Sequence, residues 1–130
     1  MTILLDTNAL LWLLGGSNRL GPAARGVLDD PDETVWTSAA SLWEVAVKHR
    51  AGRLHVDVAT VRRGAGLAGL LFLTITAEHI AGVERLPVVA GHRDPFDHLL
   101  IAQAIAEGYA FMTSDPWAAN CPVRVLPADR

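Results

Sequence analysis

The sequence is poor in cysteine, has no long uninterrupted apolar run and carries no excess of positive charge. Cys121 is the one cysteine among 130 residues, which excludes a disulfide framework and a thiolate zinc cluster. Glu44, Asp97 and Gln103 interrupt the longest apolar segments, so none reaches the roughly 18 residues that span a bilayer. The apolar start has no basic region and is interrupted by Asp6, so we expect no signal peptide. These absences predict a cytoplasmic protein that does not associate with membranes.

The charge balance limits how the protein could hold nucleic acid. A net charge of −3 argues against binding by neutralisation of many phosphates. If the chain acts on RNA, a bound divalent metal, a few arginines or a basic partner must overcome this acidity. The composition, 51% hydrophobic and 19% charged, predicts a packed fold. With no repeat or linker in 130 residues, we expect a single domain over residues 1–130.

Predicted strands and helices alternate along the whole chain. The strands are expected at residues 3–5, 34–37, 71–75, 110–113 and 123–126. The helices are expected at residues 8–14, 22–28, from a cap at Ser38 or Ser41 to residue 49, 77–84 after a cap at Thr76, and 96–107. Residues 54–70 are ambiguous, because a helix is possible over residues 57–67 but glycines weaken it. The alternation predicts an α/β fold whose parallel sheet is covered on both faces and binds ligands at the carboxyl edge of its strands.

Four acids are predicted to fall at this edge. They are Asp6 directly after the first strand, Glu44 in the helix after the second strand, Asp97 in the first turn of the helix before the fourth strand, and Asp115 after the fourth strand. Asp6 and Asp115 could instead be ordinary N-caps, because a helical turn is expected after each of them. The sequence alone leaves both interpretations open for these two residues.

Asp97 and Glu44 are harder to explain as structural residues. Asp97 shares a helix face with Ile101 and Ala104, where an ionised carboxylate is costly unless it is paired or bound to metal. The neighbouring Asp94, by contrast, is explained as an N-cap alone. Glu44 lies in a stretch with no other charge, and a pair with Lys48, four residues later, is its structural alternative.

A cluster of carboxylates would need a cation, because like charges at close range cannot all remain ionised. Magnesium or manganese fits this need, since both prefer oxygen ligands. Zinc is disfavoured, because no Cys/His pair stands at ligand spacing. Such a metal lowers the pKa of water and stabilises charge on a leaving oxygen, which is the chemistry of phosphodiester hydrolysis.

The sequence resembles the PIN-domain proteins of the VapC toxin group over nearly its whole length. The matching segments occur in the family's order, at residues 4–12, 41–45 with Lys48, 52–54, 93–97 with 100–104, and 113–115. The resemblance implies a three-layer α/β/α sandwich with a mainly parallel sheet of four or five strands, and a Mg²⁺ site, with Mn²⁺ as the alternative. The residues that match the family's acidic quartet are Asp6, Glu44, Asp97 and Asp115.

The resemblance also implies roles within the quartet. Asp6 and Asp97 would contact the metal directly, and Glu44 and Asp115 would complete the site or hold metal-bound water. Groups that could orient these carboxylates are Thr7, Asn8 and Ser114, with local capping as an equally good alternative. His98 follows Asp97 where many relatives carry arginine, so a phosphate contact is not implied at this position.

A function follows from the same resemblance. Such proteins are toxins that cut structured RNA, often tRNA, usually form homodimers and are blocked by a VapB-like antitoxin. RNA phosphate could be bound by Lys48, Arg50 and Arg93, whose alternative is simple solvation at the surface. The tryptophans could stack on bases, although Trp12 and Trp36 suit the core or a dimer interface better.

Two other functions remain open from the sequence. In a phosphoaspartyl phosphatase of the haloacid-dehalogenase type, Asp6 would be the nucleophile, but that class wants a second acid two residues later, where this chain has Asn8. In a non-catalytic PIN-like binding module, the carboxylates would only dock a basic antitoxin or an RNA-bound partner.

Overall fold

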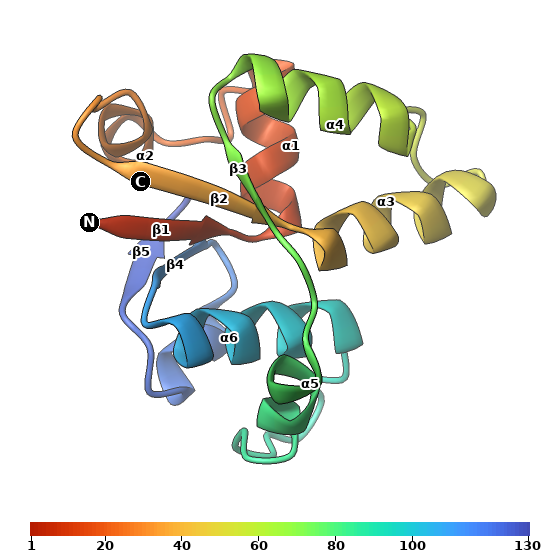
Figure 1. Cartoon of the computed structure of the whole chain (residues 1–130), viewed down its shortest axis with the longest axis vertical. Helices are drawn as coiled ribbons and strands as arrows, with labels where there is room; N and C mark the ends of the chain where they lie inside the picture. Colours follow the sequence, from red (N-terminus) through yellow and green to blue (C-terminus); the bar gives the residue numbers. More distant parts are fainter.

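The computed structural model describes residues 1–130 as a five-stranded parallel sheet with helices on both faces (Figure 1). The strands are β1 (Thr2–Leu5), β2 (Thr34–Ser38), β3 (Leu71–Leu73), β4 (Ala110–Thr113) and β5 (Val125–Pro127). The helices are α1 (Thr7–Gly15), α2 (Pro22–Leu28), α3 (Ala39–Arg50), α4 (Val58–Leu67), α5 (Ala77–Val83), α6 (Pro95–Glu107) and the short 3₁₀ helix η1 (Pro116–Asn120). The predicted α/β/α sandwich is confirmed. None of these helices is long and apolar enough to cross a membrane.

The strand order places a topological switch point between β1 and β4. The order across the sheet is β3-β2-β1-β4-β5, and every neighbouring pair is parallel. The chain therefore builds one half of the sheet outward from β1 and the other half outward from β4. Leu5 pairs with Met112 in register, and the Asp6 amide donates to the Met112 carbonyl at 3.0 Å. Ligands bind at such a switch point in open α/β sheets, outside the carboxyl ends of the strands.

Side chains of alternate residues in the central strands build two separate cores. In β1, Ile3 and Leu5 join a cluster with residues of α1, α2 and α4, whereas Leu4 joins a cluster with residues of α6 and η1. Figure 1 shows the corresponding helices on opposite sides of the strands. All three side chains are fully buried, and burial of each contributes about 1.5–3 kcal/mol. The apolar run Ile3-Leu4-Leu5 thus holds both layers of helices against the sheet.

Most predicted helix starts are confirmed by their caps. Ser38, rather than Ser41, caps α3 by accepting from the Ala40 amide, and Asp94 caps α6 with a proline in the first position. Asp57 accepts from the Thr60 amide and caps α4. The ambiguous segment is therefore a helix despite its glycines.

Several strand boundaries differ from the prediction by one or two residues, and local hydrogen bonds account for two of these differences. The structure begins β5 at Val125 rather than at residue 123, because Val123 lies in a turn where its amide donates to the Cys121 carbonyl. It ends β3 at Leu73 rather than at residue 75, because the Thr74 carbonyl accepts from the Gln103 side chain instead of from a strand.

Candidate functional site

The four predicted acids lie at the carboxyl edge of the sheet. Asp6 follows β1 and Asp115 follows β4, the two strands that flank the switch point. Glu44 and Asp97 enter from α3 and α6, whose first turns lie on the side to which the arrowheads of β1 and β2 point (Figure 1). The charges of Asp6, Glu44 and Asp115 all act on Asp97 and raise its pKa. The structure therefore brings the four carboxylates into one electrostatic group.

Asp6 is buried and both of its oxygens already have partners. One oxygen accepts from the Ala9 amide at 2.7 Å, and the other accepts from the Thr113 hydroxyl at 2.6 Å. Burial raises the pKa of Asp6 to about 6, against the lowering effect of these two hydrogen bonds. The predicted cap is present, and the long-range bond to Thr113 also ties Asp6 to the end of β4, two residues before Asp115.

Asp97 has the most perturbed carboxyl group of the site. Burial, the largest cause, and the charges of Asp94, Asp6, Glu44 and Asp115 together raise its pKa to about 8. Asp97 therefore holds a proton near neutral pH when no cation is present. A bound cation would replace that proton and remove the repulsion.

Glu44 contributes a buried carboxylate with one satisfied oxygen. Its Oε2 accepts from Lys48 Nζ at 2.5 Å, so the predicted pair four residues apart is present. Its Oε1 is buried without any hydrogen-bond partner. Because a buried carboxylate oxygen is costly to leave unpaired, Oε1 marks a place for a cation or a donor. The ion pair with Lys48 therefore accounts for Oε2 of Glu44 but not for Oε1.

Asp115 caps η1 and contacts a histidine that was not predicted. Its Oδ1 accepts from the Trp117 amide at 3.0 Å, and its Oδ2 lies 2.7 Å from His92 Nε2. Burial alone would raise the pKa of Asp115, but the hydrogen bonds from Trp117 and His92 outweigh it and hold that pKa below its usual value. Asp115 therefore ionises more readily than Asp6 or Asp97.

The most compact group of metal-ligand atoms is formed by His92, Asp97 and Asp115, whose ligand atoms all lie within 4.8 Å of one another. Asp6 and Glu44 are coupled to this group by charge and are not members of it. The oxygen-rich donor set, together with the unpaired Oε1 of Glu44, fits a divalent cation. Asp115 lies beside Asp97 in this group, and the charge of Asp6 raises the pKa of Asp97 as well, so the pairing of Asp6 and Asp97 as direct ligands stays a prediction.

The side chains of the residues expected to orient the carboxylates make no direct hydrogen bond to them. Thr7 donates to Ser41 at 3.0 Å, Asn8 is exposed, and no hydrogen bond joins Ser114 to an acid. Thr113 has that position instead, because its hydroxyl donates to Asp6 and accepts from the Asp115 amide at 3.0 Å. Its place as the last residue of β4, two residues before an acid, was a signal that could have identified it.

A buried polar chain fixes α3 against α6. The Ser38 hydroxyl donates to Gln103 Oε1 at 2.5 Å, and Gln103 Nε2 lies 3.3 Å from His79 Nδ1. Ser38 caps the helix that carries Glu44, and Gln103 lies on the helix that carries Asp97. These hydrogen bonds therefore set the relative position of α3, which carries Glu44, and α6, which carries Asp97.

The predicted phosphate-binding residues are placed in different ways. Lys48 is committed to Glu44, whereas Arg50 and Arg93 are exposed and make no ion pair. Trp43, beside Glu44 in the sequence, is 50% exposed and contacts Phe96 edge to face. Of the three cationic side chains expected at the rim, only those of Arg50 and Arg93 are available to bind RNA phosphates.

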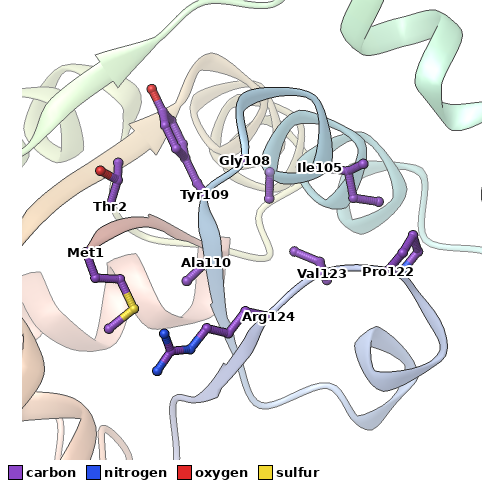
Figure 2. Close-up of a pocket in the computed structure, with 10 residues that line it drawn as sticks. Met1, Thr2, Ile105, Gly108, Tyr109, Ala110, Pro122, Val123 and Arg124 are labelled. Carbon is purple, nitrogen blue, oxygen red and sulfur yellow. The ribbon is translucent and has the colours of Figure 1, made fainter.

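A cavity of about 490 Å³ lies at the opposite edge of the sheet (Figure 2). Its walls include Met1 and Thr2 at the start of β1 and Ala110 at the start of β4, with the Arg124 side chain beside them. No aspartate or glutamate lines it. This cavity is therefore separate from the acidic site, and it is larger than the hollow of about 120 Å³ that is lined in part by His92 and Trp117.

Comparison with known proteins identifies the family. The family model described as PIN domain matches residues 3–119, so the chain belongs to the PIN-domain family. No curated protein matches significantly. The fold is that of several solved toxin–antitoxin structures, among them VapBC2 from Rickettsia felis bound to a DNA fragment from its promoter, with a TM-score of 0.68 and 14% identity over 97% of this chain and 98% of that one.

Two further structures share the fold. VapBC-1 from nontypeable Haemophilus influenzae has a TM-score of 0.66 and 14% identity, and covers 100% of both chains. FitAcB from Neisseria gonorrhoeae has a TM-score of 0.60 and 20% identity over 97% of each chain. The resemblance to the VapC group that the sequence motifs indicate is thus confirmed for the family and the fold.

Proposed function

We propose that this protein is the toxin of a VapBC-type pair, a Mg²⁺-dependent endoribonuclease that hydrolyses phosphodiester bonds in structured RNA. Mn²⁺ is the alternative ion. PIN domains of VapC toxins are typically nucleases, and the chain carries an acid at each of the four positions that resemble the family's quartet. The observation that carries the proposal is the electrostatic coupling of Asp6, Glu44, Asp97 and Asp115 at the switch point of the sheet.

The contacts of each acid suggest a different role for it in binding the metal. Asp97 and Asp115 supply oxygens within 4.8 Å of one another and would hold the metal, while Glu44 Oε1 is free to join them or to accept from water. Asp6, locked by Thr113 and Ala9, supplies a fixed negative charge beside them. When bound, the metal lowers the pKa of water and stabilises charge on the leaving oxygen.

The proposed substrate needs positive charge at the rim, because the chain as a whole is acidic. Arg50 and Arg93 are exposed and unpaired, and could contact phosphates on either side of the cleaved bond. Trp43 presents an exposed ring next to Glu44 on which an unpaired base could stack. A tRNA substrate rests on the family resemblance alone.

A VapB-like antitoxin is the proposed protein partner. The solved structures with this fold are complexes named VapBC and FitAB. On the present chain, Trp43 and Val47 are exposed along α3, and a hollow of about 490 Å³ is lined by Ala46, Val47, Arg50 and Ala51. An antitoxin segment lying along this apolar stripe would reach Glu44. The homodimer and the cytoplasmic location are proposed from the resemblance.

The phosphoaspartyl alternative is disfavoured by the contacts of Asp6. A carboxylate nucleophile needs a free oxygen that faces the substrate, but both oxygens of Asp6 accept short hydrogen bonds and the residue is 4% exposed. The non-catalytic binding module makes a different prediction from the nuclease, because it would bind RNA or antitoxin without cutting.

The test is cleavage of a panel of structured RNAs by the purified chain with Mg²⁺ or Mn²⁺. We expect cleavage that chelation abolishes and that Asp97→Asn or Asp115→Asn lowers at least about 100-fold. The matched control is Asp29→Asn, which removes an exposed acid at the end of α2, remote from the site, and should leave the rate unchanged. A wild-type chain that binds RNA but never cuts it, with either metal, would support the binding module.

A further inference from the structure

His92 projects into the acidic site from the loop between α5 and α6. Its Nε2 lies 2.7 Å from Asp115 Oδ2 and 3.9 Å from Asp97 Oδ2. These three residues form the one group of His, Cys, Asp and Glu side chains whose ligand atoms are close enough to share an ion. The Nε2 atom of His92 therefore lies in the same compact group of ligand atoms as the carboxylates of Asp97 and Asp115.

The ring of His92 is held in this orientation from two sides. Its plane stacks on the buried indole of Trp117, with ring centres 4.2 Å apart and an interplanar angle of 11°. Its other nitrogen, Nδ1, lies 2.9 Å from His98 Nε2. Metal-ligating histidines characteristically use their second nitrogen to bond a partner that fixes the ring. Trp117 and His98 give His92 that kind of support.

A second observation points to a missing ligand at the same place. Glu44 Oε1 is buried and has no partner, and the Glu44 charge raises the pKa of both Asp6 and Asp97, so this carboxylate lies near enough to the cluster to interact with it. The fixed imidazole nitrogen beside Asp97 and Asp115, with this unpaired carboxylate oxygen nearby, gives a mixed oxygen and nitrogen donor set.

We propose that His92 Nε2 is a direct ligand of the metal and makes this site selective for a first-row transition ion such as Mn²⁺ over Mg²⁺. Imidazole adds affinity for transition ions, whereas Mg²⁺ prefers oxygen and gains little from nitrogen. The inference rests on the metal site of the proposed nuclease and goes beyond it by adding a ligand outside the acidic quartet.

Ligation requires a change of hydrogen-bond roles and no change in the number of protons on the two rings. A carboxylate only accepts, so without metal His92 carries a proton on Nε2, and in a neutral ring its Nδ1 would accept from His98 Nε2–H. With metal bound, His92 would carry its proton on Nδ1 and donate it to His98 Nε2, while His98 would carry its own proton on Nδ1. The number of protons on the two rings would then be unchanged, and the Nε2 lone pair would be free to bind the ion.

The experiment is Mn²⁺ binding followed by electron paramagnetic resonance. Electron spin-echo modulation of the bound ion detects directly coordinated nitrogen, and the signal of free Mn²⁺ gives its dissociation constant. Mg²⁺ affinity is measured by competition. The test variant is His92→Phe, which keeps a ring to stack on Trp117 but has no nitrogen. The matched control is His55→Phe, at an exposed histidine outside the site.

We expect nitrogen modulation in the wild type and in His55→Phe, and none in His92→Phe. Loss of a partner in the outer shell alone weakens metal binding about 10–100-fold, so His92→Phe should weaken Mn²⁺ binding at least about tenfold. Its affinity for Mg²⁺ should change less than about threefold. If His92→Phe fails to fold, the modulation in the wild type and its persistence in His98→Ala decide the question.

Other outcomes distinguish the role of His92 as a metal ligand from the proposed nuclease function. Bound Mn²⁺ without nitrogen modulation, or equal losses of Mn²⁺ and Mg²⁺ affinity in His92→Phe, would overturn the role of His92 as a ligand and leave the nuclease intact. Nitrogen-coordinated Mn²⁺ in a chain that cuts no RNA would support the ligand and overturn the nuclease. A chain that binds neither ion at this site would overturn both.

Discussion

The carboxylate of Asp6 and the hydroxyl of Thr113 lie 2.6 Å apart, although 107 positions of sequence separate them. The same hydroxyl accepts from the Asp115 amide, so one side chain contacts both segments that carry acids at the switch point. Thr113 is 3% exposed, and no water competes for these bonds. The parallel pairing of β1 with β4 makes this contact inevitable once Leu5 is in register with Met112.

Replacing Thr113 with valine should destabilise the protein and raise the pKa of Asp6 above its present value of about 6. The substitution keeps the shape but removes a donor to a buried carboxylate, which costs about 1–3 kcal/mol. Urea denaturation at pH 8 measures the loss. The matched control is Thr37→Val, because Thr37 is equally buried and its hydroxyl has no partner. Equal losses in the two variants would mean that the bond to Asp6 contributes nothing.

Replacing Asp97 with asparagine should stabilise the metal-free protein at high pH. The folded pKa of about 8 lies above the unfolded value of 3.8, so the folded state keeps a proton that the unfolded state releases, and stability falls as pH rises from about 4 to 8. The variant lacks this loss. Because the side chain is 24% exposed, solvent screens part of the effect, and we expect a gain of about 1–2 kcal/mol at pH 8 and almost none at pH 4.

Thermal melts across this pH range test the effect of Asp97. An Asp97→Asn protein that is less stable than the wild type at pH 8 would show that the carboxylate serves the dipole of α6 rather than a cation site.

Metal binding should release protons in a way that depends on pH. Since Asp97 holds a proton below about pH 8, an ion that binds there at pH 7 must displace roughly one proton. Titration calorimetry in buffers of different ionisation enthalpy counts the protons released. The count should fall toward zero by about pH 9, where Asp97 is already ionised, and apparent affinity should rise between pH 6 and pH 8. A count that stays at zero from pH 6 to pH 9 would place the ion elsewhere.

Replacing Lys48 with methionine should destabilise the metal-free protein and make it more dependent on metal. The change leaves the buried carboxylate of Glu44 without its one partner. Loss of one member of a buried pair costs about 3–5 kcal/mol, but Lys48 is 33% exposed, so we expect about 1–2 kcal/mol.

Melts with and without Mn²⁺ measure the effect of Lys48→Met. The ion should restore most of the loss, because it supplies the positive charge that Lys48 provided. Arg50→Met is the control for loss of charge from the same helix, since Arg50 is exposed and unpaired. An identical response to Mn²⁺ in the two variants would separate Glu44 from the metal site.

The quartet could be predicted from sequence because each acid has a local signal. Asp6 and Asp115 directly follow buried strands, and Asp97 lies in the first turn of a strongly apolar helix. Parallel topology then brings strand ends together regardless of sequence distance. The side chains that form hydrogen bonds with these acids were not predictable in the same way. Thr7, Asn8 and Ser114 are neighbours of acids in the chain, but the hydroxyl of Thr7 bonds Ser41, Asn8 is exposed, and Ser114 makes no hydrogen bond to an acid.

His92 could not be found from the sequence for a different reason. It lies in a loop between α5 and α6 that has no periodic pattern, and its contacts depend on the path of that loop over Trp117. The position of Trp117 depends in turn on η1, a short 3₁₀ helix that Asp115 caps. A chain of tertiary contacts of this kind leaves no trace in residue spacing.

A crystal of the protein grown with Mn²⁺, with data collected at the manganese absorption edge, tests the central claim most directly. We expect an anomalous peak within coordination distance of Asp97 and Asp115, on the side of the cluster where Glu44 Oε1 has no partner. No peak at the carboxyl edge of β1 and β4 at millimolar Mn²⁺, or an ion bound only at another surface, would contradict the metal site from which the nuclease is inferred.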